Sequence, residues 1–398
     1  MLSDRMSRLR PSPTLAMTAQ AAALKAEGRD IIDMGVGEPD FDTPQFIKDA
    51  AFQAMQEGKT KYTAVPGTLA LRKAIVAKFQ RENQISFTPE DIIVSAGAKH
   101  VIFNAFLASL NPGDEVIIPA PYWVSYPDMV AFAEGTPVIV ACPPEDQLKL
   151  TPPALENAIT PRTKWVIVNS PNNPTGMAYT RSELEALADV LRRYPYVSIL
   201  SDDIYEHLVY DDFVFSTLAQ VAPDLQSRIL TVNGVSKSYA MTGWRIGYGA
   251  GPRDLIKAMS MLQSQSTSNA CSIAQEAARV ALEGPQDFMK EWTQVFQDRR
   301  NQALAILNGT PGLSCLKPQG AFYLYAFCND LLGKTTPTGT LLKTDGDVSS
   351  FLLDSAGVAV VPGSAFGSPP AFRLSYALAT DLLLEGCHRI AHAVSLLQ

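Results

Sequence analysis

Between about residue 90 and residue 250, short runs of apolar and β-branched residues alternate with stretches that have the composition of helices. Each run is short and apolar enough to be a buried strand. Near-continuous apolar strands separated by helices are typical of a mainly parallel sheet covered by helices on both faces, which is an α/β arrangement. The predicted strands are Ile92–Val94, Glu115–Ile118, Pro137–Val140, Trp165–Val168, Val197–Leu200 and Ile229–Val232.

The pattern changes after about residue 290. A charged helical stretch, Trp292–Leu307, precedes three strand-like runs at Gly320–Tyr325, Val358–Gly363 and Phe372–Tyr376. This order predicts a smaller α+β domain, which the N-terminal segment joins. We therefore expect a large domain over residues 46–288 and a small domain made of residues 1–45 and 289–398.

Composition and charge narrow the classes of protein. The chain has 398 residues, 46% of them hydrophobic, and a formal net charge of -7 without a long basic run, which argues against nucleic acid as a partner. No apolar stretch has membrane-spanning length, and the N-terminus lacks the apolar core of a signal peptide. Five scattered cysteines without a CxxC motif, and four histidines outside any cluster, favour a reducing cytoplasm and no metal site.

Polar residues that could bind a ligand or take part in catalysis follow the predicted strands, where α/β sheets bind ligands. Lys237 comes shortly after the run Ile229–Val232, among small and hydroxylic residues. A desolvated lysine there is suited to attack a carbonyl as a neutral amine. Arg245, eight residues later, offers a fork of donors suited to a phosphate. An aldehyde that carries a phosphate is pyridoxal 5′-phosphate; the alternative is a loop lysine and a structural arginine.

Asp202 and Tyr205 follow the strand Val197–Leu200. The carboxylate is placed to keep the cofactor's pyridine nitrogen protonated, and the tyrosine to donate to its phenolate oxygen. Either residue alone is usually a helix cap or a packed aromatic side chain. Asn173, in the turn Pro171–Gly176, adds a second donor to the same oxygen.

Other candidates carry weaker signals. Gly97 and Ala98 follow a strand and begin a helical stretch, so their backbone amides suit a phosphate. An ordinary glycine turn would have the same sequence pattern. Trp123 is placed to stack on a pyridine ring or to pack in the core. Gly37 allows close approach of the backbone to a substrate. Arg373, in an apolar strand, is suited to bidentate capture of a carboxylate or to a buried ion pair.

Together these residues resemble the class I, fold type I, pyridoxal-phosphate-dependent aminotransferases over essentially the full chain. The matching order is Gly37, Tyr62, Trp123, Asn173-Pro174-x-Gly176, Asp202-x-x-Tyr205, Ser236-Lys237, Arg245 and Arg373. The resemblance implies the fold type I architecture, with Lys237 as the Schiff-base lysine that acts as base and then as acid. It implies Asp202 as the partner of the pyridine nitrogen, Ser236 and Arg245 as cofactor ligands, and Arg373 as partner of the substrate's α-carboxylate. It also implies a homodimer in which Tyr62 reaches the neighbouring subunit's cofactor.

Within this family the chain is most similar to the bacterial Ib-type aspartate aminotransferases, some of which also convert prephenate to arogenate. The resemblance implies ping-pong transfer from aspartate to 2-oxoglutarate, giving oxaloacetate and glutamate. It places Lys99 at the substrate's distal carboxylate and Arg10 where relatives that use prephenate have a lysine; arginine keeps the charge but presents its donors differently. Gly234 and Tyr126 depart from many relatives, which have a phosphate-binding serine and, in animal-type enzymes, a histidine there.

Three alternatives to this reaction stay open. The first is an aminotransferase for aromatic or other amino acids, and the second is a pyridoxal-phosphate-dependent lyase on the same fold. The third is a non-catalytic amino-acid sensor of the kind found in some transcription regulators, which carry an N-terminal DNA-binding domain. Because the resemblance begins near residue 7, we expect no such domain here.

Overall fold

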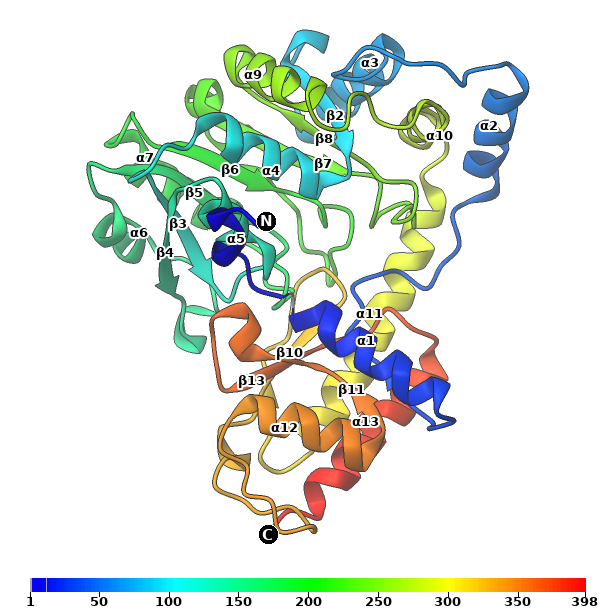
Figure 1. Ribbon diagram of the computed structural model, residues 1–398, viewed down its shortest axis with the longest axis vertical. Coiled ribbons are helices and arrows are strands. Elements are labelled where there is room, and N and C mark those ends of the chain that lie inside the picture. The colour runs from blue at the N-terminus through cyan, green and yellow to red at the C-terminus, as the bar shows by residue number, and fades with distance from the viewer. Residues whose placement is uncertain (1, 12) are drawn as a thin grey trace.

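A seven-stranded sheet forms the centre of the upper part of the molecule (Figure 1). The computed structural model describes residues 2–11 and 13–398. The strand order is β2-β8-β7-β6-β5-β3-β4, and the pairs among β7, β6, β5, β3 and β4 are all parallel. The predicted α/β fold with a mainly parallel sheet is therefore confirmed.

Each of the six predicted strands is present, and each is one to three residues longer than predicted, although β6 begins one residue later, at Ser198. Their bounds are β2 Ile92–Ala96, β3 Glu115–Ala120, β4 Thr136–Ala141, β5 Thr163–Asn169, β6 Ser198–Asp202 and β7 Ile229–Gly234. The longer bounds place Asp202 in the last position of β6 instead of after the strand. The carboxyl ends of these strands, where ligands bind in such sheets, lie at one edge.

The seventh strand, β8 (Ile246–Ala250), was not predicted from the sequence, and it runs antiparallel to both β2 and β7. Gly247 and Gly249 within β8 weaken the strand signal in the sequence, because glycine has a low strand propensity. The packing explains Gly247: a Cβ there would lie 2.0 Å from the backbone nitrogen of Ala98, at the start of the next helix. Because β8 is antiparallel, its amino end and Arg245 before it lie at the ligand-binding edge.

Successive residues of the strands point to opposite faces of the sheet and into separate hydrophobic clusters. Ile92 and Val94 belong to one cluster, and Ile93 between them belongs to the other. On the first face pack α3 Leu69–Lys78, α6 Pro152–Ala158, α7 Arg181–Arg192, α8 Leu218–Val221 and α10 Ser272–Glu283. Helix α2 Gln45–Gln56 joins the same cluster by packing on α10. On the second face pack α4 Ala98–Ser109, α5 Ser125–Phe132 and α9 Arg253–Ser264.

The lower part of the molecule is a smaller α+β unit (Figure 1). Its four-stranded antiparallel sheet has the order β12-β13-β10-β9, and a separate parallel pair joins β1 to β11. The strands are β1 Ile32–Asp33, β9 Ser314–Cys315, β10 Tyr323–Phe327, β11 Val358–Ala359, β12 Val361–Pro362 and β13 Ala371–Ser375. The helices are α1 Pro13–Ala26, α11 Asp287–Asn308, α12 Asp345–Phe351 and α13 Thr380–Ser395.

The N-terminal segment contacts both parts. Strand β1 pairs with β11, as expected for a segment that joins the smaller unit. The short 3-10 helix η1 (Asp4–Arg8) instead packs on α5, and Arg8 forms a 2.9 Å ion pair with Glu134. The division of the chain into domains at residues 45 and 288 stays a prediction.

In the described part of the chain, no helix is long and apolar enough to cross a membrane. All five cysteines are free thiols, and Cys271 is the exposed one among them.

Candidate active site

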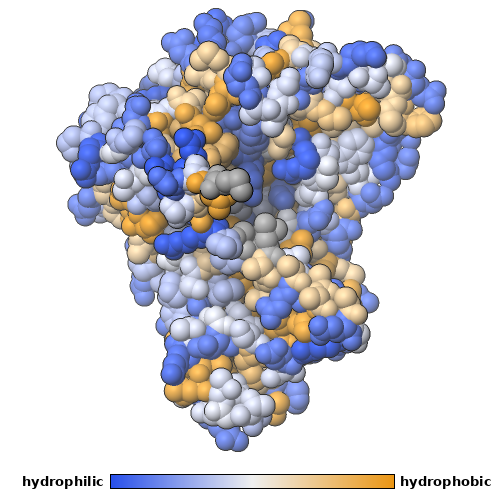
Figure 2. Space-filling model, viewed as in Figure 1, coloured by the Kyte–Doolittle hydropathy of each residue, from blue (hydrophilic) through white to orange (hydrophobic). Residues whose placement is uncertain are grey.

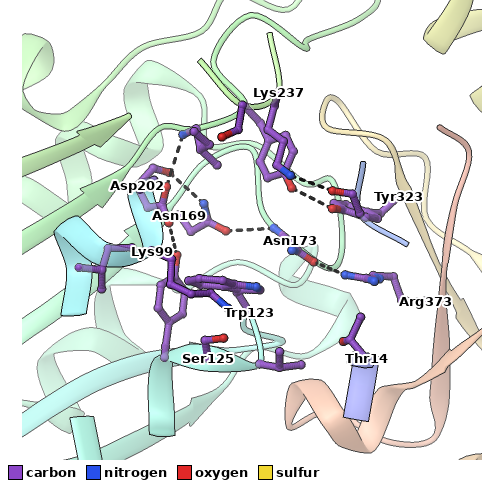
Figure 3. Close-up of a pocket in the computed structure, with 18 of the residues that line it drawn as sticks. Thr14, Lys99, Trp123, Ser125, Asn169, Asn173, Asp202, Lys237, Tyr323 and Arg373 are labelled. Atoms are coloured by element: carbon purple, nitrogen blue, oxygen red, sulfur yellow. Dashed lines mark hydrogen bonds between the residues drawn. The ribbon is translucent and has the colours of Figure 1, made fainter. Parts of the chain in front are cut away.

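A cavity of about 330 Å³ opens at the carboxyl edge of the large sheet, where the upper and lower parts of the molecule meet. Figure 2 shows this face hollowed at that level, and Figure 3 shows the side chains within. Most of the residues predicted for the site are brought together here. Those that line the cavity are Gly37, Ala98, Lys99, Trp123, Asn173, Asp202, Tyr205, Ser236, Lys237, Arg245 and Arg373.

Three predicted residues do not line the cavity. Gly97 lies directly behind it, against the Arg245 guanidinium. Tyr62 is 92% exposed and lies outside the cavity wall. Arg10 is exposed and lies close enough to Asp128, at the start of α5, for its backbone N–H and its charge to oppose the rise in the pKa of that carboxyl that burial causes. The roles of Tyr62 and Arg10 therefore stay predictions.

Lys237 projects into the cavity from the turn that follows β7, and its Nζ donates to the Gly37 carbonyl at 2.7 Å (Figure 3). Burial lowers the pKa of this amine to about 8, and the positive charges of Arg245, Arg373 and Lys99 act in the same direction. The carboxylate of Glu38 opposes them. About one tenth of the amine is therefore neutral at pH 7, far more than for an ordinary lysine, and the neutral form is the one that acts as nucleophile or general base.

Asp202 lies at the end of β6, 4% exposed, with its carboxylate held on both sides. Tyr126 donates to Oδ2 at 2.5 Å, and the Ile204 backbone N–H donates to Oδ1 at 3.4 Å. Asn169 fixes the same residue by donating to its backbone carbonyl at 2.9 Å. Burial raises the pKa of the Asp202 carboxyl to about 6, although the Tyr126 bond acts against this. The carboxylate is thus a buried, oriented acceptor that a cationic ring nitrogen would stabilise.

An anion cradle forms where α4 begins. Gly97 has a φ of +87°, and a Cβ in its place would collide with the Arg245 guanidinium. Arg245 itself has a φ of +56°, a strained conformation for a residue other than glycine. It donates to the carbonyls of Thr242 and Ala96 at 2.9 and 3.3 Å, which leaves further N–H groups free of these bonds. The helix N-terminus at Ala98, Ser236 and Arg245 together suit a phosphate.

Arg373 reaches the cavity from β13 and is 3% exposed. Its guanidinium donates to Asn173 Oδ1 at 2.9 Å and to the Gly35 carbonyl at 2.5 Å. Within the described chain, its buried Nε has no hydrogen-bond partner. A buried cation that lacks a paired carboxylate is costly. Because the Asn173 oxygen accepts from Arg373, the amide nitrogen of Asn173 is left to donate to a ligand.

Several residues of the site were missed in the sequence. Thr14, on α1, lines the cavity with a buried Oγ1 that lacks a partner among the described residues. Asn169 ends β5, and Tyr323, on β10, bonds to Tyr205 across the cavity wall. Asn169 begins the polar run that follows the predicted strand Trp165–Val168, but no role was assigned to it from the sequence. Thr14 and Tyr323 carry no such signal, because only the tertiary fold brings them here.

The residues present fit pyridoxal phosphate. The anion cradle suits its phosphate, Asp202 its ring nitrogen, and Tyr205 and Asn173 its phenolate oxygen, while Lys237 has a neutral amine for its aldehyde. Elsewhere in the described chain, Glu82, Glu206 and His207 are close enough together to hold a cation. The buried ammonium of Lys78 already occupies that position, bonded to Glu206 and 3.4 Å from Glu82.

Comparison with known proteins agrees with this geometry. The family profile "Aminotransferase class I and II" matches residues 29–390. An aspartate/prephenate aminotransferase of Cereibacter sphaeroides is 57% identical over 389 residues, covering 98% of this chain and 97% of the relative. The crystal structure of an aspartate aminotransferase from Rhizobium meliloti is 54% identical, with a TM-score of 0.98 and complete coverage of both chains. The aspartate aminotransferase of Thermus thermophilus with maleate is 43% identical, with a TM-score of 0.92 and 99% coverage of both chains. The chain belongs to the class I and II aminotransferase family.

Proposed function

We propose that this aminotransferase uses pyridoxal 5′-phosphate to move the amino group of aspartate to 2-oxoglutarate. The observation that carries the proposal is the pair of cations that line the cavity in addition to Lys237 and the Arg245 of the anion cradle. Arg373 is buried with an unpaired Nε, and Lys99 lies elsewhere on the wall with its Nζ 4.9 Å from the centre of the Trp123 ring (Figure 3). Two cations in one cavity suit a substrate with two carboxylates.

The α-carboxylate is the natural ligand of Arg373, since a guanidinium binds a carboxylate with two parallel bonds. Arg373 lines the same cavity as Lys237 and is close enough for its charge to lower the pKa of that amine, so a substrate whose α-carboxylate binds Arg373 would have its Cα near Lys237. The bound cofactor would supply an electron-accepting ring that stabilises the charge left when a Cα proton is removed. The neutral amine of Lys237 takes that proton and later returns one, acting as base and then as acid.

Lys99 and Thr14 are the groups on this chain best suited to hold the distal carboxylate. Lys99 supplies the charge, and Thr14 supplies a buried hydroxyl without a partner in the described structure. The relatives support a dicarboxylate substrate, because their names specify aspartate, and one of the solved structures is with maleate. Prephenate also carries two carboxylates, and the Cereibacter relative is named for both substrates. We therefore propose prephenate as a second amino acceptor.

Two further features belong to this proposal. The 92% exposed side chain of Tyr62 suits a homodimer in which it reaches the cofactor of the neighbouring subunit. The five free cysteines suit a reducing compartment such as the cytoplasm.

A product panel tests the proposal. With aspartate and 2-oxoglutarate, the purified protein loaded with pyridoxal phosphate is expected to form oxaloacetate and glutamate in equal amounts. Pyruvate and ammonia would instead indicate a lyase, and preferential turnover of aromatic substrates would indicate an aromatic aminotransferase. Prephenate, with aspartate or glutamate as donor, is included and is expected to yield arogenate.

The role of Lys99 is tested in the same panel. Lys99→Ala is expected to raise the KM for aspartate and 2-oxoglutarate by about tenfold or more while the cofactor stays bound, because one charge-assisted bond is lost. Lys290→Ala, a change of an exposed lysine on α11, is the matched control and is expected to behave as wild type. An unchanged preference of Lys99→Ala for dicarboxylates would reject the assignment. Arg10→Ala, assayed with prephenate and with aspartate, tests whether Arg10 acts on prephenate alone.

A further inference from the structure

Two buried tyrosines from different parts of the fold share a hydrogen bond at the cavity wall. The hydroxyl of Tyr205, which follows β6 of the large sheet, lies 2.8 Å from the hydroxyl of Tyr323, on β10 of the small sheet. Tyr205 and Tyr323 are 3% and 1% exposed, so water does not compete for this bond. Figure 3 shows Tyr323 on the side of the cavity where Lys237 projects.

A phenol has a single proton, so the direction of this bond decides what Tyr205 can do. If Tyr205 donates to Tyr323, it has no proton left for the cofactor's phenolate oxygen. We propose that Tyr323 is a positioning residue, whose hydroxyl donates to Tyr205 and thereby commits the Tyr205 proton to the cofactor. This inference rests on the proposed binding of pyridoxal phosphate.

The surroundings of the pair favour this direction. The Arg373 guanidinium carbon lies 4.5 Å from the centre of the Tyr323 ring, and its charge opposes the rise in the pKa of Tyr323 that burial causes. Burial raises the pKa of Tyr205 well above its usual range, and the charge of Arg373 lowers it only as a smaller contribution. A cation against the Tyr323 ring strengthens the Tyr323 hydroxyl as a donor, because it stabilises negative charge on that phenol oxygen. Accepting a bond also polarises Tyr205 and strengthens its own donation, since chains of hydrogen bonds are cooperative.

Gly37 provides the space that the pair requires. A Cβ at Gly37 would lie 2.5 Å from the Tyr323 hydroxyl oxygen, closer than any side chain tolerates. The sequence suggested that Gly37 allows the backbone to approach a substrate. Its carbonyl accepts from Lys237, and its missing side chain leaves room for the Tyr323 hydroxyl, so Gly37 positions both side chains.

The test is the pH titration of the bound cofactor's absorbance in the loaded enzyme. A donor to the phenolate oxygen stabilises the chromophore's deprotonated form, so losing or weakening that donor raises the midpoint of the titration. Tyr205→Phe is expected to raise the midpoint most. Tyr323→Phe is expected to raise the midpoint by about 0.5 pH unit. It leaves the bond from Tyr205 to the cofactor in place and removes only the strengthening that this bond receives from Tyr323. Added to Tyr205→Phe, it is expected to cause no further shift.

Tyr325→Phe is the matched control. Tyr325 is a buried tyrosine on the same strand, 2% exposed, and its hydroxyl donates to the Ser368 carbonyl at 2.6 Å, outside the cavity wall. It is expected to leave the midpoint unchanged. The inference is overturned if Tyr323→Phe has the wild-type midpoint, or if Tyr325→Phe raises the midpoint as much as Tyr323→Phe does. It is also overturned if Tyr323→Phe raises the midpoint of the Tyr205→Phe enzyme as much as it raises the midpoint of wild type. A wild-type protein with no pH-dependent cofactor absorbance would instead contradict the proposed cofactor.

Discussion

The depressed pKa of Lys237 leads to a quantitative prediction about its reactivity. Burial and three nearby cations lower the pKa of this amine from 10.5 to about 8. At pH 7 about one tenth of the amine is then neutral, against about 0.03% for an ordinary lysine, a difference of roughly 300-fold. Because the pKa is lowered, Lys237 changes from the charged to the neutral form as the pH rises through about 8, whereas an ordinary lysine does so near 10.5.

Competitive labelling measures this directly. The cofactor-free protein is treated with trace acetic anhydride across pH 6 to 11, and peptide mass spectrometry follows each lysine separately. Lys237 is expected to reach half-maximal labelling near pH 8, while exposed lysines in the same sample serve as internal controls and titrate near 10.4 as a class.

Removing the carboxylate of Glu38 should change the pKa of Lys237 in a direction that is known in advance. Glu38 raises the pKa of Lys237 against the effect of burial, and its own side chain is held by Thr242. Glu38→Gln removes that charge, so the labelling midpoint of Lys237 is expected to fall further, by a few tenths of a pH unit at low salt and by less at high salt because Glu38 is exposed. A midpoint near 10 for Lys237, or a rise in Glu38→Gln, would refute the electrostatic account of the site.

Two other predictions concern the support of the cofactor. Tyr126→Phe removes the 2.5 Å donor to Asp202, a bond to a charged group worth about 1.5–3 kcal/mol, so the pKa of Asp202 should rise above about 6. Cofactor affinity, measured by equilibrium dialysis, should fall about tenfold, and unchanged affinity would show that the bond does not support the ring. For Tyr62, mixed dimers of Tyr62→Ala and Lys237→Ala subunits should recover roughly half of the wild-type activity while each parent dimer stays impaired, because one complete site forms per mixed dimer. No recovery on mixing would place Tyr62 outside the neighbouring site.

The sequence was sufficient to predict the elements whose signals are local. Apolar runs such as Trp165–Val168 and Ile229–Val232 found the parallel strands, because a strand buried on both faces is apolar throughout. Residues at or after these strands, Asp202 and Lys237 among them, then share one edge by the geometry of the fold. Gly97 and Ala98 of the anion cradle were found for the same reason, whereas Arg245 was found from its spacing to Lys237, and Ser236 from the family resemblance.

Features that depend on tertiary packing were not predictable in this way. The glycines of β8 hide a strand because the start of α4 packs on Gly247, a contact between segments about 150 residues apart in the chain. Tyr323 and Thr14 enter the cavity from β10 and α1, whose sequences show core and helix patterns only. The partner of Arg373 was likewise undetermined: an ion pair was an alternative to a substrate site, and the structure shows a buried guanidinium with an unbonded Nε.

The central claim, that Lys237 carries out a two-stage amino transfer, is tested most directly by running each half-reaction alone. Aspartate added to the cofactor-loaded enzyme without an acceptor should yield one oxaloacetate per active site and then stop. Subsequent addition of 2-oxoglutarate should yield one glutamate per site, and Lys237→Ala should do neither at a comparable rate. Continuous release of ammonia from aspartate alone, or full turnover by Lys237→Ala, would contradict the account.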